Sequence, residues 1–342
     1  MMDTSTLLAL VQDGVVNGAI YALLALALVL VFAVTRTIFI PVGEIVSFAA
    51  LTYAGLDGKT TPPVLALTMG LGLVAFLRGA VKARGRALMI LALETLGLPA
   101  TVTAIVMAVV PMQLGIVANA AIAILCVAPL APLLYRIAFA PLAEASVLVL
   151  LIASVGAHLA LSGLGLLVFG PEGARGDAFS DAVLEMGPII LPGQAIWVLA
   201  ATLATMIGLW AFFRFTLAGA ALRATAINRR GARLVGIATD QAGLHAFWLA
   251  GLIAAVSGVL IAPLTTIYYD GGFLIGLKGF VAAIVGGLVS YPLAALAAIA
   301  VGILESFAAF QASAFKEVIV FAGIIPVLLW RSLRHVSVED EE

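Results

Sequence analysis

Residues 222–237 read LRATAINRRGARLVGI and form the centre of the most basic connection in the chain. The surrounding segment, 214–241, contains five arginines and separates two long apolar runs at 195–213 and 243–262. Ala, Leu and Arg favour a helix, and Gly236 can end it. We therefore expect a short cytoplasmic helix beneath a membrane domain, available to a partner. The alternative is an ordinary positively charged loop of the kind that sets membrane topology.

The composition indicates a membrane protein with many spans. Hydrophobic residues make up 64% of the chain and charged residues 10%, whereas soluble domains have about 45–50% and about 25%. The net charge of -1 is uninformative about nucleic acid, but the sequence shows no basic face of the kind that nucleic-acid-binding proteins carry. The single cysteine, Cys126, excludes a disulfide within the chain and a cysteine-rich metal site. The first residues lack the basic region of a cleaved signal, so we expect the first apolar run to remain as a membrane helix.

Apolar runs long enough, or nearly long enough, to cross a bilayer recur throughout the chain, since a span needs roughly 20 such residues. They lie at 7–34, 38–55, 62–77, 87–110, 113–135, 146–169, 195–213, 243–262, 277–290, 292–310 and 316–331. The runs at 62–77 and 277–290 are short, so each could be tilted, broken or re-entrant. We predict an all-α polytopic bundle of about 10–11 transmembrane or partly re-entrant helices, forming one domain over 1–342.

The charges between these runs predict the orientation of the chain. Each odd-numbered run ends near Lys or Arg, as at Arg36 and Arg136, whereas the opposite ends carry Asp57 and the acidic loop 170–194. Because positive loops face the cytoplasm, we expect the N-terminus and a periplasmic loop 170–194 outside and the C-terminus inside.

Polar side chains inside the apolar runs are candidates for a translocation pathway, because such groups are costly in a membrane unless they face protein or water. Asn17 and Tyr21 lie one helical turn apart, and Asn17 could instead bond a neighbouring helix. Glu44 follows Pro41, where a helix dipole would favour its carboxylate without any further role.

Further candidates occur later in the chain. Ser154 and His158 also lie one turn apart, and an interhelical hydrogen bond competes with a proton relay as their role. Lys278 precedes a glycine-rich break and could line a pathway or extend to the membrane interface. We expect Glu305 to face protein, and we expect Glu94, near Pro99, to be buried or neutral in a distorted helix.

No set of residues in the sequence suggests catalysis. Lys59 follows Gly58, as in a phosphate-binding loop. Such a loop also needs a glycine five residues before Gly58, and that position is occupied by Tyr53. The histidines lack metal-ligand spacing, and no nucleophile lies beside a base. We therefore expect neither catalytic residues nor a metal or cofactor on this chain. Energy for transport would come from a partner subunit or an ion gradient.

Five stretches together resemble the permease of a bacterial ATP-binding cassette importer of the branched-chain amino acid type. They are NGAIYALLAL at 17–26, FIPVGE at 39–44, FAPL at 139–142, GAALRA through ARLVGI at 219–237, and GLKGF through GILE at 276–305. Residues 60–112 are extra relative to this pattern and fit one added helical hairpin. The order and spacing of the five stretches carry the resemblance.

The resemblance implies a second permease subunit, homologous or identical, two cytoplasmic ATPases that bind ATP and Mg, and a periplasmic solute-binding protein, at the bacterial inner membrane. It also identifies an ATPase-coupling helix whose candidate contacts are Arg223, Ala226, Asn228, Arg229, Arg230, Arg233, Leu234 and Gly236. The expected solutes are branched-chain or other hydrophobic amino acids, or related amides, urea or carboxylates. Alternatives are a sugar- or nucleoside-type permease of the same transporter class and a stand-alone carrier or channel.

Overall fold

The structure, a computed structural model, describes residues 3–56, 61–81, 83–112, 115–186, 189–288, 290–323, 325–327 and 329. Within these ranges, seven helical segments are long and apolar enough to cross a membrane. Four are single helices: α1 (Thr4–Thr35), α8 (Val147–Phe169), α9 (Gly193–Phe215) and α12 (Thr239–Ile261). The other three are the composite segments Arg86–Met112, Ile116–Leu142 and Tyr291–Val327. The predicted all-α polytopic membrane fold is confirmed.

The composite segments change helix type along their length, and in the first two of them prolines lie at or near the changes. The first contains α4 (Arg86–Ala92), a π-helical turn η1 (Leu93–Gly97), α5 (Leu98–Val109) and η2 (Val110–Met112). The second contains α6 (Ile116–Val127), α7 (Leu130–Leu134), a π-helical turn η3 (Tyr135–Phe139) and η4 (Ala140–Leu142). The third contains α14 (Tyr291–Ala312), η5 (Ser313–Phe315) and α15 (Lys316–Ala322). Pro99 lacks the amide proton that would bond the carbonyl four residues earlier, and this accounts for the helix distortion predicted near Pro99.

Shorter helices complete the bundle: α2 (Val42–Leu56), α3 (Val64–Ala80), α10 (Leu217–Ile227), α11 (Arg229–Leu234) and α13 (Gly272–Val285). The run expected at 277–290 was placed too late, because α13 begins at Gly272 and the chain leaves the helix at Gly287 and Leu288, whose φ angles are 83° and 58°. The last expected run is also not a straight span. α15 folds back on α14, since a Cβ at Gly323 would lie 3.2 Å from the Leu304 side chain.

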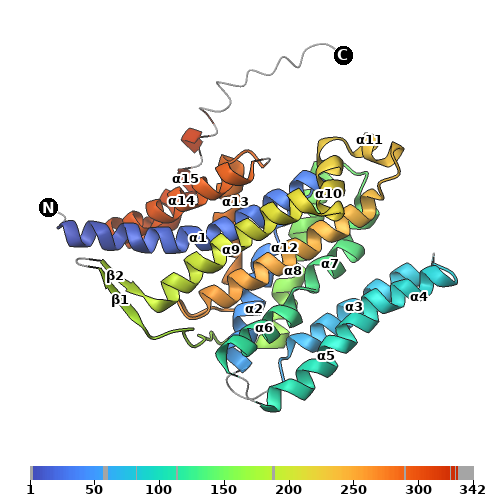
Figure 1. Cartoon of the computed structure of the whole chain (residues 1–342), viewed down its shortest axis with the longest axis horizontal. Helices are drawn as coiled ribbons and strands as arrows, with labels where there is room; N and C mark the ends of the chain where they lie inside the picture. The colour runs from blue at the N-terminus through green and yellow to red at the C-terminus, as the bar shows by residue number, and fades with distance from the viewer. Residues whose placement is uncertain are drawn as a thin grey trace, which may run out of the picture.

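The long helix α1 forms the centre of the bundle. It is buried along most of its length, and Figure 1 shows it running beside α9 and α14. Gly14 and Gly18 bring the backbones of α1 and α14 together: Cβ atoms there would lie 2.5 Å from Cα of Ile303 and 2.6 Å from Cα of Ile299. Such close approach is the usual function of small residues between membrane helices.

Two parts of the molecule lie outside this bundle. α3 and the α4–α5 segment form one edge of the molecule (Figure 1) and expose many large apolar side chains, such as Leu77, Met89 and Ile105. The predicted loop 170–194 contains a small hairpin in which β1 (Val183–Met186) pairs antiparallel with β2 (Ile189–Pro192). Gln12 of α1 donates a hydrogen bond to the Ile190 carbonyl at 2.7 Å, so this hairpin lies at the N-terminal end of α1.

Candidate functional site

One buried ionic cluster joins four helices in the membrane region. The Lys278 ammonium on α13 donates to Glu305 Oε1 on α14 at 2.6 Å and to Glu317 Oε1 on α15 at 3.1 Å. The Tyr21 hydroxyl on α1 donates to the other Glu305 oxygen, Oε2, at 2.6 Å. Lys278 and Glu305 are only 5% and 7% exposed. The prediction that Glu305 faces protein is confirmed, and extension of Lys278 to the membrane interface is wrong, because its charge is neutralised inside the protein.

A second buried pair connects α2 and α8. The Glu44 carboxylate, in the first turn of α2, is fully buried and lies 2.6 Å from His158 Nδ1 through its Oε1. One turn before His158, Ser154 Oγ accepts a hydrogen bond from the Ile40 amide at 2.9 Å. The other Glu44 oxygen, Oε2, has no hydrogen-bond partner among the described residues. The predicted interhelical hydrogen bond is therefore confirmed for His158, which bonds Glu44 of α2, whereas Ser154 bonds the turn before α2. Glu44 thus has a hydrogen-bond partner besides the helix dipole.

The short helix α13 contacts both clusters. Its Phe273 ring stacks on His158, with centroids 4.4 Å apart, and its Lys278 belongs to the ionic cluster. The first turn of α13 is fixed against α2, because the Gly272 amide donates to Ser47 Oγ at 2.6 Å. One short helix thus brings together most of the candidate pathway residues. Asn17, half-buried on α1, lies one turn before Tyr21.

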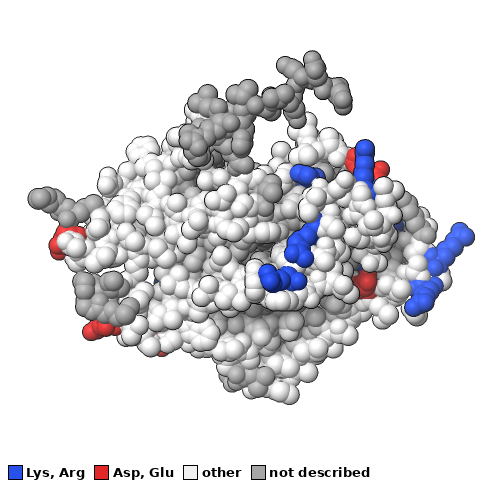
Figure 2. All heavy atoms as spheres, turned by 45° about the horizontal axis from the view of Figure 1, so that its top comes forward, with Lys and Arg blue, Asp and Glu red and all other residues white. Residues whose placement is uncertain are grey.

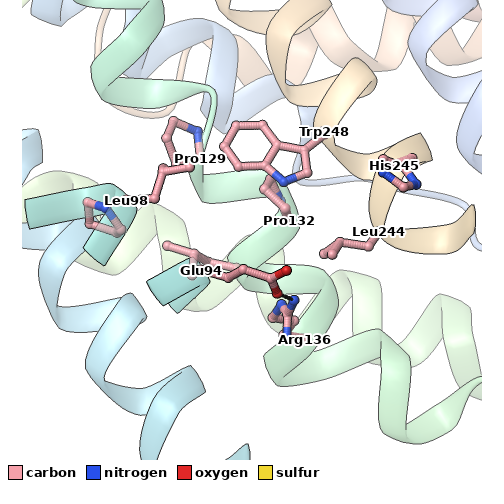
Figure 3. A pocket seen from close by; sticks show the side chains of 10 residues that line it. Glu94, Leu98, Pro129, Pro132, Arg136, Leu244, His245 and Trp248 are labelled. Carbon is pink, nitrogen blue, oxygen red and sulfur yellow. Dashed lines mark hydrogen bonds and ion pairs between the residues drawn. The ribbon is translucent and has the colours of Figure 1, made fainter. Parts of the chain in front are cut away.

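A pocket at the junction of the α4–α5 segment and the bundle contains the remaining membrane-depth carboxylate. Figure 3 shows Glu94 pointing to Arg136, with His245 and Trp248 of α12 on the facing side of a cavity of about 200 Å³. Glu94 and Arg136 form an ion pair, and the Glu94 side chain is 47% exposed. The expectation that Glu94 is buried is therefore wrong: its side chain is half-exposed and pairs with the arginine of the neighbouring π-helical turn.

The basic segment 214–241 forms two helices instead of the one expected. α10 ends at Ile227, and α11 starts after Asn228, whose side chain accepts a hydrogen bond from the Gly231 amide at 2.8 Å. Asparagine is among the best N-cap residues, so it starts a new helix and breaks the old one. Gly236 ends α11 as predicted, with φ of 86° and a bond from the Ile237 amide to the Ala232 carbonyl.

Two arginines attach this segment to the rest of the protein. Arg229 donates to the Ala143 carbonyl at 2.9 Å and lies 3.5 Å from Asp240, and Arg233 pairs with Glu144 at 2.9 Å. The hydrogen bond and charge of Arg233 lower the pKa of the Glu144 carboxyl, so this surface pair stays ionised at neutral pH. Arg229 and Arg233 therefore hold the segment against the loop after η4 and the start of α12.

The outer surface of the segment combines apolar and basic groups. Leu234 and Ile227 are 88% and 85% exposed, and Arg223 and Arg230 are exposed beside them, whereas Ala226 is half-buried against the bundle. Figure 2 shows basic side chains gathered at the end of the molecule that carries α10 and α11. Exposed apolar side chains with basic neighbours are typical of a surface that binds another protein.

Sequence reasoning missed the partners that complete these clusters. Glu317 is a third member of the ionic cluster, Phe273 covers His158, and Glu144 holds Arg233. An acidic residue within the apolar run 316–331 was the available signal for Glu317. No pattern in the sequence singles out Phe273 or Glu144.

Comparisons with known proteins agree with this architecture. The family model described as "Branched-chain amino acid transport system / permease component" matches residues 83–328. The match begins inside 60–112, so the status of that segment as an added hairpin stays a prediction. Similar proteins are the high-affinity branched-chain amino acid transport system permease proteins LivH of Salmonella typhimurium and Escherichia coli K12, each 31% identical, and BraD of Pseudomonas aeruginosa, 29% identical.

These similarities cover 57% of this chain and about 65% of the length of the LivH relatives, and 66% of BraD. No solved structure matches the chain. The family match nevertheless includes both π-helical turns, the basic segment and the helices that bear Lys278 and Glu305. The chain belongs to the family of permease components of branched-chain amino acid transport systems.

Proposed function

We propose that this protein is the permease subunit of an ATP-binding cassette importer that moves branched-chain or other hydrophobic amino acids, or related small amides, urea or carboxylates, into the cell. The observation that carries the proposal is the family match over 83–328, which runs from the segment before α4 through α15 and includes the exposed α10–α11 segment. The names of the similar proteins support the choice of solute class.

The energy comes from outside this chain, from two cytoplasmic ATPase subunits that bind ATP and Mg. The α10–α11 segment is the proposed contact, through exposed Arg230 and Leu234. Arg229 and Arg233 attach this segment to α12 and to the loop after η4, so a movement of the segment would displace both. A shift of α12 relative to α1 and α2, on which it packs, would then open and close the pathway by alternating access.

The complete importer contains a second permease subunit, homologous or identical, and a periplasmic solute-binding protein that sets much of the specificity. Its location is the bacterial inner membrane, with the N-terminus outside. The C-terminus is proposed to be cytoplasmic, and residues 330–342 lie outside the described part of the structure. Asn17, Tyr21, Glu44, Ser154, His158, Lys278 and Glu305 remain the proposed pathway residues.

Reconstitution with the proteins encoded beside this chain tests the proposal. We expect ATPase activity that rises when a solute-binding protein loaded with a hydrophobic amino acid is added to proteoliposomes. A response only to sugars or nucleosides would favour the related permease class. Solute uptake without any ATPase would refute the proposal in favour of a stand-alone carrier or channel.

A second experiment tests the docking surface. Arg230→Glu and Leu234→Asp change exposed side chains that hold no described contact, so we expect both to reduce ATPase co-purification while membrane insertion is unchanged. Arg84→Glu, an exposed arginine in the turn before α4, is the matched control. Arg229 is unsuitable as a test because its internal contacts make it necessary for the local fold. Wild-type ATPase recovery with Arg230→Glu and Leu234→Asp would show that the surface is assigned wrongly.

A further inference from the structure

Three arginines at the basic end of the molecule lack acidic partners within the described residues. Arg36 caps the end of α1, Arg214 lies in the last turn of α9, and Arg223 lies on α10. Two of them lie over aromatic rings: Arg214 is 5.6 Å from the Trp210 ring centroid, and Arg36 is 5.9 Å from that of Phe32. By contrast, Arg136, Arg229 and Arg233 each pair with a carboxylate. An anion from outside the chain would satisfy the first three.

Two apolar crevices meet beside these arginines. A cavity of about 460 Å³ lies between α1, α9 and the start of α14, lined by Leu26, Met206, Leu209, Trp210 and Pro292, with Arg214 at its edge. A second cavity of about 310 Å³ lies between the ends of α1 and α10, lined by Phe32, Val34, Leu222, Ala226 and Leu288, with Arg36 at its edge.

The third arginine, Arg223, lies in the wall that the two crevices share. Phe213, Arg223 and Tyr291 line both cavities, and the rings of Phe213 and Tyr291 lie 5.5 Å apart. Among the described residues, no Asp or Glu lines either cavity. Arg223 therefore lies where the two apolar crevices meet, with Arg214 lining one of them and Arg36 lining the other. Trp210 and Tyr291 are of the types that collect at the membrane interface.

We propose that this site binds an anionic diacyl phospholipid, with its phosphate at Arg36, Arg214 and Arg223 and one acyl chain in each crevice. Basic pockets between membrane helices on the cytoplasmic side are suited to such headgroups. A zwitterionic lipid fits less well, because its ammonium would meet three cations and no carboxylate. The bound lipid bridges α1, α9, α10 and α14, and so holds α10 in place beside the proposed ATPase contact.

Lipid retention by the full-length protein tests the site directly. The protein is purified into nanodiscs containing equal amounts of palmitoyl-oleoyl phosphatidylglycerol and phosphatidylcholine, and lipids that remain after transfer to detergent are quantified by native mass spectrometry. We expect selective retention of phosphatidylglycerol. Arg214→Gln should lower that retention about fivefold, as expected for one arginine near an anionic headgroup. Arg84→Gln, which removes an exposed arginine away from the crevices, should retain the wild-type amount.

A second variant tests whether lipid retention depends on the shape of the larger crevice as well as on charge. Met206→Trp fills the larger crevice without changing any charge, and it should also reduce phosphatidylglycerol retention. Equal retention of the two lipids by wild type, or full retention by Arg214→Gln, would overturn the proposal. So would thermal stabilisation by inorganic phosphate equal to that by phosphatidylglycerol, which would show a site for the free anion. Loss of the lipid when the second permease subunit is present would show that a protein covers this surface, and would equally refute it.

Discussion

Replacing Lys278 with methionine tests whether the buried cluster stabilises the bundle through its charge. Methionine keeps the length and apolar stem of the side chain and removes only the ammonium. In the wild type, this ammonium lies 2.6 Å from Glu305 and 3.1 Å from Glu317. Lys278→Met therefore leaves two carboxylates close together with no cation between them.

The expected cost follows from these distances and from burial. At an effective dielectric constant of about 20, opposite charges 2.6 Å apart attract by about 6 kcal/mol. Desolvation offsets much of this, and removing one member of a buried pair costs about 3–5 kcal/mol. Glu305→Gln should cost less, about 1–3 kcal/mol, because the ammonium keeps Glu317, whose side chain is 33% exposed and can draw on water.

Thermal unfolding of the purified protein in one detergent measures the difference. We expect Lys278→Met to lower the unfolding temperature by about 5–15 °C and Glu305→Gln by clearly less. The double variant should be more stable than Lys278→Met alone, because neutralising Glu305 removes one uncompensated carboxylate. Equal effects of the two single variants, or strictly additive effects in the double variant, would refute the charge-based explanation and leave packing alone.

Further predictions concern single positions elsewhere in the bundle. Gly43→Ala should destabilise strongly, since a Cβ there would overlap the Gly272 backbone, whereas Gly156→Ala, with nothing within 4 Å, should unfold within about 1 °C of wild type or slightly above it. His158→Phe should lower the unfolding temperature more than His158→Gln, because only glutamine can still donate to the buried Glu44, and equal values would argue against that hydrogen bond. Gly236→Val should reduce ATPase co-purification more than Gly236→Asn, since asparagine tolerates the positive φ better; no difference would mean that this helix end is not needed for docking.

The sequence was sufficient to predict those features that depend on bilayer thickness or on one residue's own conformational preference. Apolar runs locate the helices because each span must satisfy its backbone internally. Gly236 ends α11 because its backbone angle suits glycine, and Glu305 faces protein because lipid would leave its charge unpaired. Each of these features depends only on a residue and its immediate neighbours.

The predictions that failed concern residues whose environment depends on a partner far away in the sequence. Arg136 was read as a charge that sets topology, but it neutralises Glu94, 42 positions away, and so removes the reason for Glu94 to be buried. Asn228 was counted as a contact on a continuous helix, although its capping preference breaks that helix. The sequence does not distinguish a membrane-interface position from an interior position for Lys278, because the choice depends on its contacts with Glu305 and Glu317.

The helix α13 links the two buried clusters that the sequence treated as separate candidates. Its Phe273 end is fixed, because Gly43 and Gly272 approach too closely for any side chain and Ser47 holds the Gly272 amide. Its other end runs into the positive-φ residues Gly287 and Leu288, where the backbone follows no regular helix. The helix is also close-packed beside Lys278, since a Cβ at Gly279 would lie 2.6 Å from Leu24 Cβ. A displacement of α13 would therefore alter the Phe273–His158 contact and the Lys278 ion pairs together, so that one movement affects both clusters.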